Sequence, residues 1–206
     1  MPGAIVVQRP LARPAQLALL FHGVGASASD LQPLGEGLAL HLHNALVVSV
    51  QAPFASDFGA GWQWFSVQGI TEENRPARVA AAMPRFVDTV SKWQAEAGVG
   101  PAATMLVGFS QGVIMSLAAT QEATPPAHRI VSIAGRFARP PLLAPADTHV
   151  HLMHGDADRV VPHRFSIEAA AQLQALGADA TLDLFPGLGH GIDQRVLALI
   201  LERCAP

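Results

Sequence analysis

Short apolar runs alternate along the chain with longer stretches in which apolar residues recur every three or four positions. This alternation is typical of βα units stacked on a mostly parallel sheet, whose strands are covered by helices on both faces. We therefore expect an α/β fold with a mostly parallel sheet of six or seven strands. The predicted strands cover residues 16–21, 45–50, 103–108, 129–133, 149–154 and 181–185, with a weaker candidate at residues 5–8.

The predicted helices lie between these runs. Regularly spaced leucines predict a helix over residues 30–42, and the same period extends from Val79 to Ala97. Pro84 should kink that second helix, because proline removes a backbone hydrogen bond. Further helices are expected at residues 112–121, at residues 163–176 with Gly177 as a stop signal, and at residues 192–203.

Two segments do not follow the alternation. Residues 51–71 hold five aromatic side chains among glycines, which is costly unless the loop folds over the domain or binds an apolar ligand. Residues 135–147 contain three prolines and are too short for a helical lid. We therefore expect residues 1–206 to form one domain with an open site, helices on both faces of its sheet and no lid domain.

The composition restricts the possible partners. Of 206 residues, 50% are hydrophobic and only 14% are charged, which allows one domain with a sizeable core. The formal net charge of -3 leaves no basic surface of the kind that nucleic-acid binding requires. We expect no nucleic-acid partner.

The N-terminal residues predict neither a signal peptide nor a membrane span. Residues 1–10 lack a positively charged start and contain an aliphatic run of only three residues. The longest apolar run after them, residues 17–21, is far shorter than the roughly 20 residues that a membrane span needs. Cys204 is the single cysteine, so no internal disulfide can form. We expect a soluble cytoplasmic protein without stable membrane insertion, and a homodimer remains open.

The strongest motif is Gly-Phe-Ser-Gln-Gly at residues 108–112, a G-x-S-x-G pattern between a predicted strand and a predicted helix. A serine on such a sharp strand-to-helix turn has its hydroxyl raised above the carboxyl edge of the sheet. Glycines two positions before and after it remove side chains where strand and helix come close. We predict that Ser110 is a nucleophile.

A serine nucleophile needs a base and an orienting carboxylate, expected in the chain order Ser, Asp, His. Residues 150–162 form a predicted strand that ends in a glycine turn carrying Asp156 and Asp158. We choose Asp158 as the acid because it lies deeper in the loop, where its side chain can reach across. Asp156, beside the glycine, is expected to bond local backbone amides as an Asx-turn residue.

The predicted base is His190, in a glycine-rich loop between the last strand and the last helix. Among the nine histidines, His154 and His163 are its rivals because they flank the acid loop. Order along the chain favours His190. The other closely spaced histidines lack further ligands at metal-binding spacing, so no metal is expected.

Acyl transfer also needs backbone amides that stabilise the developing oxyanion. One donor is expected to be Gln111, directly after the nucleophile, and the other Val24, in the glycine-rich loop of residues 22–25. That loop could also be an ordinary β-to-α turn. A dinucleotide loop is not indicated, because no G-x-G-x-x-G pattern follows.

Taken together, the motifs resemble the phospholipase/carboxylesterase family, which includes the acyl-protein thioesterases. They are His22-Gly23-Val24-Gly25, residues 108–112, His154-Gly155-Asp156-Ala157-Asp158 with Val161-Pro162, and Gly189-His190. Residues 63–72 resemble the YpfH-type bacterial esterases of that family. The resemblance implies a single-domain α/β-hydrolase that cleaves carboxylic esters without metal or organic cofactor. It also implies the triad Ser110, Asp158 and His190, with oxyanion donors at Val24 and Gln111.

The expected activity is hydrolysis of short- to medium-chain acyl esters through an acyl-enzyme. The same site would serve an acyl-protein thioesterase, a lysophospholipase-type hydrolase or an acyltransferase. A non-catalytic ligand-binding protein is the alternative from another class, because fold alone does not set function. The candidate substrate-binding residues are Trp62, Trp64, Phe65 and Leu188, although the aromatic residues could instead pack the long loop against the core.

Overall fold

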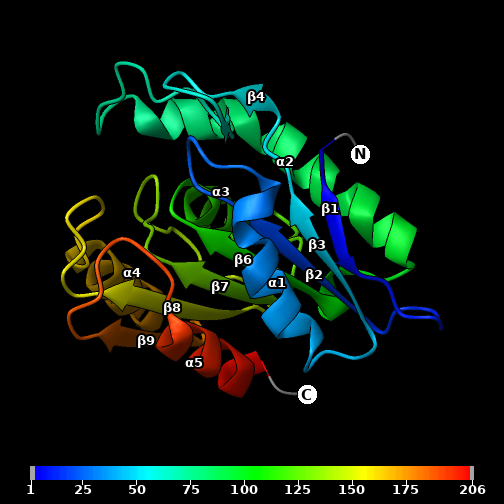
Figure 1. Ribbon diagram of the computed structural model, residues 1–206. Helices are drawn as coiled ribbons and strands as arrows, with labels where there is room; N and C mark the ends of the chain where they lie inside the picture. The colour runs from blue at the N-terminus through cyan, green and yellow to red at the C-terminus, as the bar shows by residue number, and fades with distance from the viewer. Residues whose placement is uncertain (1–2, 205–206) are drawn as a thin grey trace.

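The computed structural model describes residues 3–204, which form an α/β unit around a seven-stranded sheet (Figure 1). The strand order is β1-β3-β2-β6-β7-β8-β9. Only β1 runs antiparallel to its neighbour, and the other strands pair in parallel. The strands are β1 (Ile5–Gln8), β2 (Gln16–Phe21), β3 (Ala45–Val50), β6 (Thr104–Phe109), β7 (Arg129–Ile133), β8 (His149–Gly155) and β9 (Ala180–Phe185). The predicted mostly parallel α/β sheet is confirmed, with all seven strands within one residue of their expected bounds.

Among residues 3–204, four α-helices lie between strands and a fifth follows the last strand: α1 (Gln32–Ala39), α2 (Arg75–Ala97), α3 (Gln111–Ala119), α4 (Arg164–Ala175) and α5 (Gln194–Cys204). The predicted helix over residues 30–42 was too long at both ends. A 3-10 turn, Ala28–Leu31, precedes α1, and within it Asp30 accepts the backbone N–H of Ser27 at 2.9 Å. This capping contact turns the chain before the α-helix begins. Helix α2 continues through Pro84 and ends at Gly98, whose φ of 69° is left-handed.

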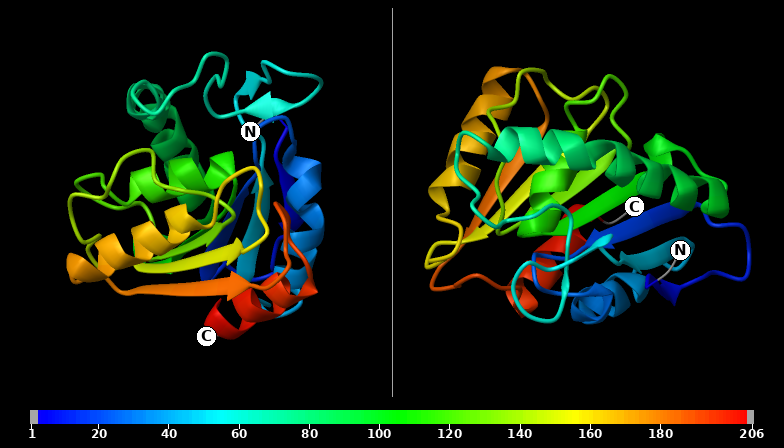
Figure 2. Two further views of the ribbon diagram at one scale, coloured as in Figure 1. Left: turned by 90° about the vertical axis from the view of Figure 1, so that its left-hand side faces the viewer. Right: turned by 90° about the horizontal axis from the view of Figure 1, so that it is seen from above.

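Helices cover both faces of the sheet, as Figure 2 shows. Helices α2, α3 and α4 pack on one face, and α1 and α5 pack on the other. Successive side chains of a central strand therefore enter different cores: Leu19 of β2 belongs to the first core and Leu20 to the second. Burial on both faces explains why the central strands are continuous apolar runs.

The long aromatic segment forms a small hairpin beside the domain, with β4 (Phe54–Ala55) paired to β5 (Trp62–Gln63). Directly after it, the Trp64 ring packs edge-on against Phe21 at 5.3 Å and Phe86 at 5.4 Å between ring centroids. The hairpin itself keeps Phe58 64% exposed. The segment is therefore anchored in the core directly after the hairpin, while the turn of the hairpin projects into solvent.

Within residues 3–204, no helix combines the length and apolar character needed to cross a lipid bilayer.

Candidate active site

The parallel strands β2, β6, β8 and β9 end at the same edge of the sheet, and their loops converge there. Ser110 stands at the turn between β6 and α3 with φ 53° and ψ -112°. Positive φ is strained for a residue other than glycine, and such strain is common at functional turns. Gly112 permits the close crossing beneath this turn, because a Cβ there would lie 2.0 Å from the carbonyl oxygen of Phe21.

Ser110, His190 and Asp158 form one continuous hydrogen-bonded chain. His190 Nε2 lies 3.0 Å from Ser110 Oγ, and His190 Nδ1 lies 2.7 Å from Asp158 Oδ2. The His190 side chain is 17% exposed, whereas that of Asp158 is fully buried. The Phe109 ring packs against the imidazole with 5.0 Å between centroids. The imidazole is therefore partly open to solvent and is held by Ser110, Asp158 and Phe109.

The Asp158 carboxylate has a partner on each oxygen. Oδ1 accepts the amides of Val160 at 2.8 Å and Val161 at 2.9 Å, while Oδ2 accepts from His190. Burial alone would raise the pKa of Asp158, but the hydrogen bonds from His190 and the two amides outweigh it and hold the pKa below its ordinary value. The carboxylate is therefore ionised at neutral pH and can stabilise an imidazolium.

The rival candidates for the acid and the base, Asp156, His154 and His163, lie outside the hydrogen-bonded chain from Ser110 to His190 to Asp158. Asp156 Oδ1 accepts the backbone amide of Gly187 at 2.7 Å. Because this donor lies 31 positions further along the chain, the expectation of a local Asx turn was wrong. This bond ties the acid loop to the loop that carries His190. His163 stands at the position directly before α4. His154 lies behind Asp158, with Nε2 at 3.1 Å from Oδ2.

The loop after β2 runs directly against Ser110. A Cβ at Gly23 would lie 3.1 Å from Ser110 Cβ. Within residues 3–204, the amides of Val24 and Gln111 have no backbone acceptor, so both remain available to a substrate oxygen. This is the condition that an oxyanion hole requires.

Two buried polar side chains support this arrangement, and the sequence reasoning did not assign these roles to them. His22 Nε2 accepts the amide of Ala52 at 3.1 Å, which leaves Nδ1–H to donate to the Gly23 carbonyl at 2.7 Å. Gln111 Oε1 accepts the amide of Trp64, and its Nε2 donates to the carbonyl of Phe65, both at 2.8 Å. A glutamine at a buried helix start was the available signal, but its partners lie 46 and 47 positions away.

The predicted substrate-binding residues are divided between core and surface. Trp64 and Phe65 are 2% and 5% exposed and belong to the core under α2, so the structure places their side chains in packing rather than along an open site. The physical reason is the Trp64 indole, which fills the space beside Phe21 and donates Nε1–H to the His22 carbonyl at 3.2 Å. Trp62 is 41% exposed, and Leu188 packs partly buried against the core under α5.

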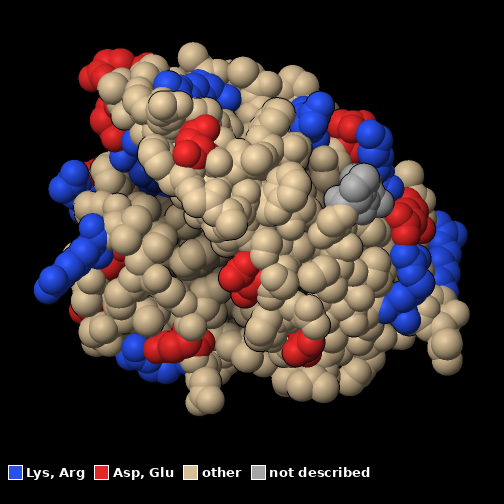
Figure 3. All heavy atoms as spheres, turned by 45° about the horizontal axis from the view of Figure 1, so that its top comes forward, with Lys and Arg blue, Asp and Glu red and all other residues tan. Residues whose placement is uncertain are grey.

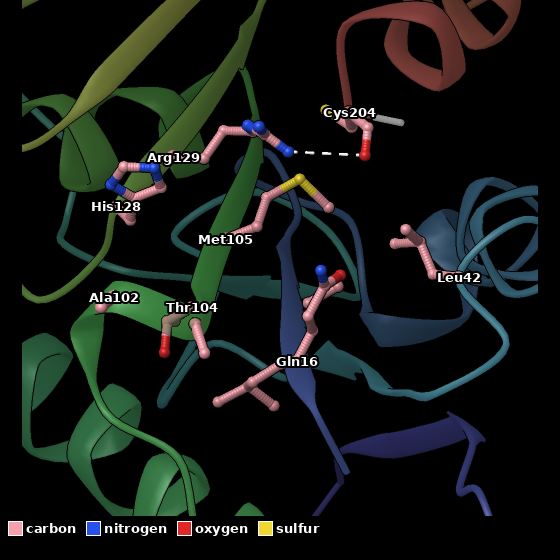
Figure 4. Close-up of a pocket in the computed structure, with 11 residues that line it drawn as sticks. Gln16, Leu42, Ala102, Thr104, Met105, His128, Arg129 and Cys204 are labelled. Carbon is pink, nitrogen blue, oxygen red and sulfur yellow. Dashed lines mark hydrogen bonds between the residues drawn. The ribbon is translucent and has the colours of Figure 1, made fainter. Parts of the chain in front are cut away.

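A separate pocket of about 250 Å³ lies at the amino ends of β2, β6 and β7 (Figure 4). Arg129 points across it and donates from Nη1 to the Cys204 carbonyl at 3.4 Å. Ser110 stands at the opposite edge of the sheet, so this pocket has no part in the site described here. Among residues 3–204, no group of three or more His, Cys, Asp or Glu side chains is placed to hold a metal ion.

Comparison with known proteins agrees with this architecture. A family model described as Phospholipase/Carboxylesterase matches residues 2–204. Esterase YpfH of Escherichia coli (strain K12) is 45% identical over 197 residues, which cover 96% of this chain and 85% of that protein. The crystal structure of esterase PE8 superposes with a TM-score of 0.87 at 32% identity and covers 95% of this chain and 94% of that one.

A more distant relative is named as a thioesterase. Acyl-protein thioesterase 1 of Gibberella zeae is 30% identical over 116 residues, which cover 52% of this chain and 48% of that protein. The full-length family match and the 45% identity to an esterase decide the assignment. The chain belongs to the phospholipase/carboxylesterase family of α/β-hydrolases and is a carboxylic ester hydrolase.

Proposed function

We propose that the protein hydrolyses short- to medium-chain acyl esters through an acyl-enzyme on Ser110. The observation that carries this proposal is the unbroken chain from Ser110 Oγ through His190 to Asp158, with separations of 3.0 and 2.7 Å. Both distances allow proton transfer and orientation in the resting enzyme.

In the proposed mechanism, His190 Nε2 takes the proton of Ser110 as Oγ attacks the ester carbonyl. The resulting oxyanion accepts the amides of Val24 and Gln111, each worth roughly 3 to 4 kcal/mol in acyl transfer. Collapse breaks the ester C–O bond, and His190 protonates the departing alkoxide. Water then attacks the acyl-enzyme with His190 again as base, which releases the acid and restores Ser110.

The surroundings of the site suit an uncharged substrate. Figure 3, in which the top of the molecule is turned forward, shows a face covered mostly by uncharged residues, with a few Asp and Glu side chains within it and many of the Lys and Arg side chains towards its edges. Val24 lies in the loop after β2, and Trp62 lies in the hairpin that is hydrogen-bonded to this loop. Their exposed fractions are 39% and 41%. An apolar acyl or alcohol group would find exposed apolar surface on these two side chains.

Thioester hydrolysis is the second candidate, and the similarity to an acyl-protein thioesterase favours it. The attack and the oxyanion are the same, and only the leaving group changes from an alkoxide to a thiolate. An assay over acyl chain length, with oxygen and sulfur esters measured side by side, separates the two. Higher kcat/KM on oxygen esters of short chains supports the proposal, and a preference for long-chain thioesters contradicts it.

The test of the nucleophile is Ser110→Ala. Turnover of p-nitrophenyl esters should fall by roughly 10⁴-fold or more, because no other group can form the acyl-enzyme. The melting temperature should change by no more than about 2 °C, because the exchange removes a single oxygen atom at the site. Undiminished turnover by the folded variant would refute the mechanism.

A further inference from the structure

His154 is buried beneath the acid of the proposed triad and takes no part in the mechanism described above. It stands near the end of β8, four positions before Asp158, and its side chain is fully buried. Each ring nitrogen nevertheless has partners: Nδ1 lies 2.7 Å from Ser166 Oγ, and Nε2 lies 2.8 Å from the Val161 carbonyl and 3.1 Å from Asp158 Oδ2. A buried polar group with so many contacts is held in one orientation.

The partners fix the tautomer of this imidazole. A carbonyl oxygen can only accept, and an ionised carboxylate can only accept, so Nε2 must carry a hydrogen that it shares between Val161 and Asp158. Burial lowers the pKa of His154 against the opposing hydrogen bonds to Val161 and Asp158, which keeps the ring neutral. Nδ1 is then unprotonated and accepts the hydroxyl hydrogen of Ser166.

We infer that His154 is a positioning residue of the triad, acting as a neutral donor that orients the Asp158 carboxylate from behind. This inference rests on the proposed function, because it concerns the same carboxylate. The first link is direct: Nε2–H donates to Oδ2, the oxygen that receives His190. The second link passes through Val161, whose carbonyl accepts from His154 while its amide donates to Asp158 Oδ1 at 2.9 Å.

A neutral donor behind the carboxylate has two consequences. It favours the ionised form of Asp158 without adding a positive charge that would repel the imidazolium of His190. The donor also disperses the charge on Oδ2, so its loss should strengthen the attraction between this oxygen and the imidazolium of His190. The titratable side chains with the largest effect on the pKa of His154 are Asp158, which raises it, and His190, which lowers it, and both belong to the proposed triad.

The test compares two amide variants of nearly equal polarity. In His154→Gln the side-chain nitrogen can reach the place of Nε2 and donate to Asp158, whereas in His154→Asn it reaches only the place of Nδ1. We expect His154→Asn to lower kcat at least tenfold with KM within twofold, and to move the acidic limb of the kcat/KM profile to higher pH. His154→Gln should recover most of kcat and the original limb. Folded fraction is measured for each by circular dichroism.

A matched control perturbs the same imidazole from its other side. Ser166→Ala removes the partner of Nδ1 but leaves Nε2–H facing Asp158, so stability should fall while kcat per folded molecule stays within about twofold of wild type. If His154→Asn and His154→Gln have equal kcat and equal pH profiles per folded molecule, His154 is only structural and the inference fails. If the wild type itself lacks Ser110-dependent ester turnover, the proposed function fails instead, so the two failures are distinguishable.

Discussion

Asp156 and Asp158 lie two positions apart in one loop, and their partners give them different roles. Asp158 is buried and accepts from His190 and two backbone amides, whereas Asp156 accepts the amide of Gly187 and so connects two loops. An asparagine at 156 retains an oxygen that can accept that amide. An asparagine at 158 loses the negative charge and can favour the wrong tautomer of His190.

We therefore expect Asp158→Asn to lower kcat by roughly 10³- to 10⁴-fold, while Asp156→Asn stays within a few-fold of wild type. Steady-state kinetics on a p-nitrophenyl ester measures both variants, and thermal melting shows that each is folded. The reverse order of losses would transfer the acid role to Asp156.

At the scale of elements, the hairpin β4–β5 is joined by its backbone to the loop of residues 22–26, which carries the proposed oxyanion donor Val24. The amide of Gly25 donates to the Trp62 carbonyl at 2.9 Å, and the amide of Trp62 donates to the Ala26 carbonyl at 2.8 Å. Gly61 makes this approach possible, because a Cβ there would lie 2.1 Å from the carbonyl oxygen of Gly25. The hairpin therefore fixes the path of the loop that carries Val24.

Gly61→Ala should push the loop of residues 22–26 away. If Val24 is the proposed oxyanion donor, kcat should fall by about 10²-fold or more, the usual effect of losing one such donor. Gly59→Ala is the matched control in the same hairpin. Its added methyl meets nothing within 4 Å, although its φ of 73° makes the change mildly strained. Kinetics and melting of both variants decide the matter: equal activity would show that the hairpin does not support catalysis.

The elements also show what sequence can and cannot predict. The seven strands of the main sheet were predictable because burial on both faces leaves continuous apolar runs. The strands β4 and β5 are two residues long, which is too short for any periodic signal. The burial of Trp64 could not be predicted from the neighbouring residues either, because it depends on Phe21 and Phe86 from distant elements.

The candidate active site likewise has a part that the sequence predicts and a part that it does not. Ser110, Asp158 and His190 could be selected because each follows a parallel strand, and parallel strands end at one edge of the sheet. The contact between Asp156 and Gly187 and the links of Gln111 to the hairpin depend on how loops pack, which has no signature in the local sequence.

At the scale of the whole molecule, buried neutral histidines predict sensitivity to acid. Burial, followed by the nearby charges of Arg129 and Arg203, lowers the pKa of His151 to about 4. The unfolded chain, with a histidine pKa of about 6.5, then binds more protons than the folded protein between pH 6.5 and 4. Stability is therefore highest above this window and falls as the pH drops through it.

His151→Leu should reduce this acid destabilisation by about 1 to 2 kcal/mol between pH 7 and pH 4.5, a figure that allows for solvent screening. Urea unfolding at the two pH values measures the difference. His43→Leu, at an exposed position, is the control for the loss of a histidine from the surface. A variant of His151 with the full wild-type pH dependence would show that other groups are responsible.

The central claim is that Ser110 is a nucleophile activated by His190, and reaction with a fluorophosphonate probe tests it most directly. Peptide mass spectrometry of the folded protein should find the adduct on Ser110, and His190→Ala should slow its formation by about 100-fold or more. Folded protein that gains no adduct at Ser110, or that labels equally fast without His190, would contradict the account.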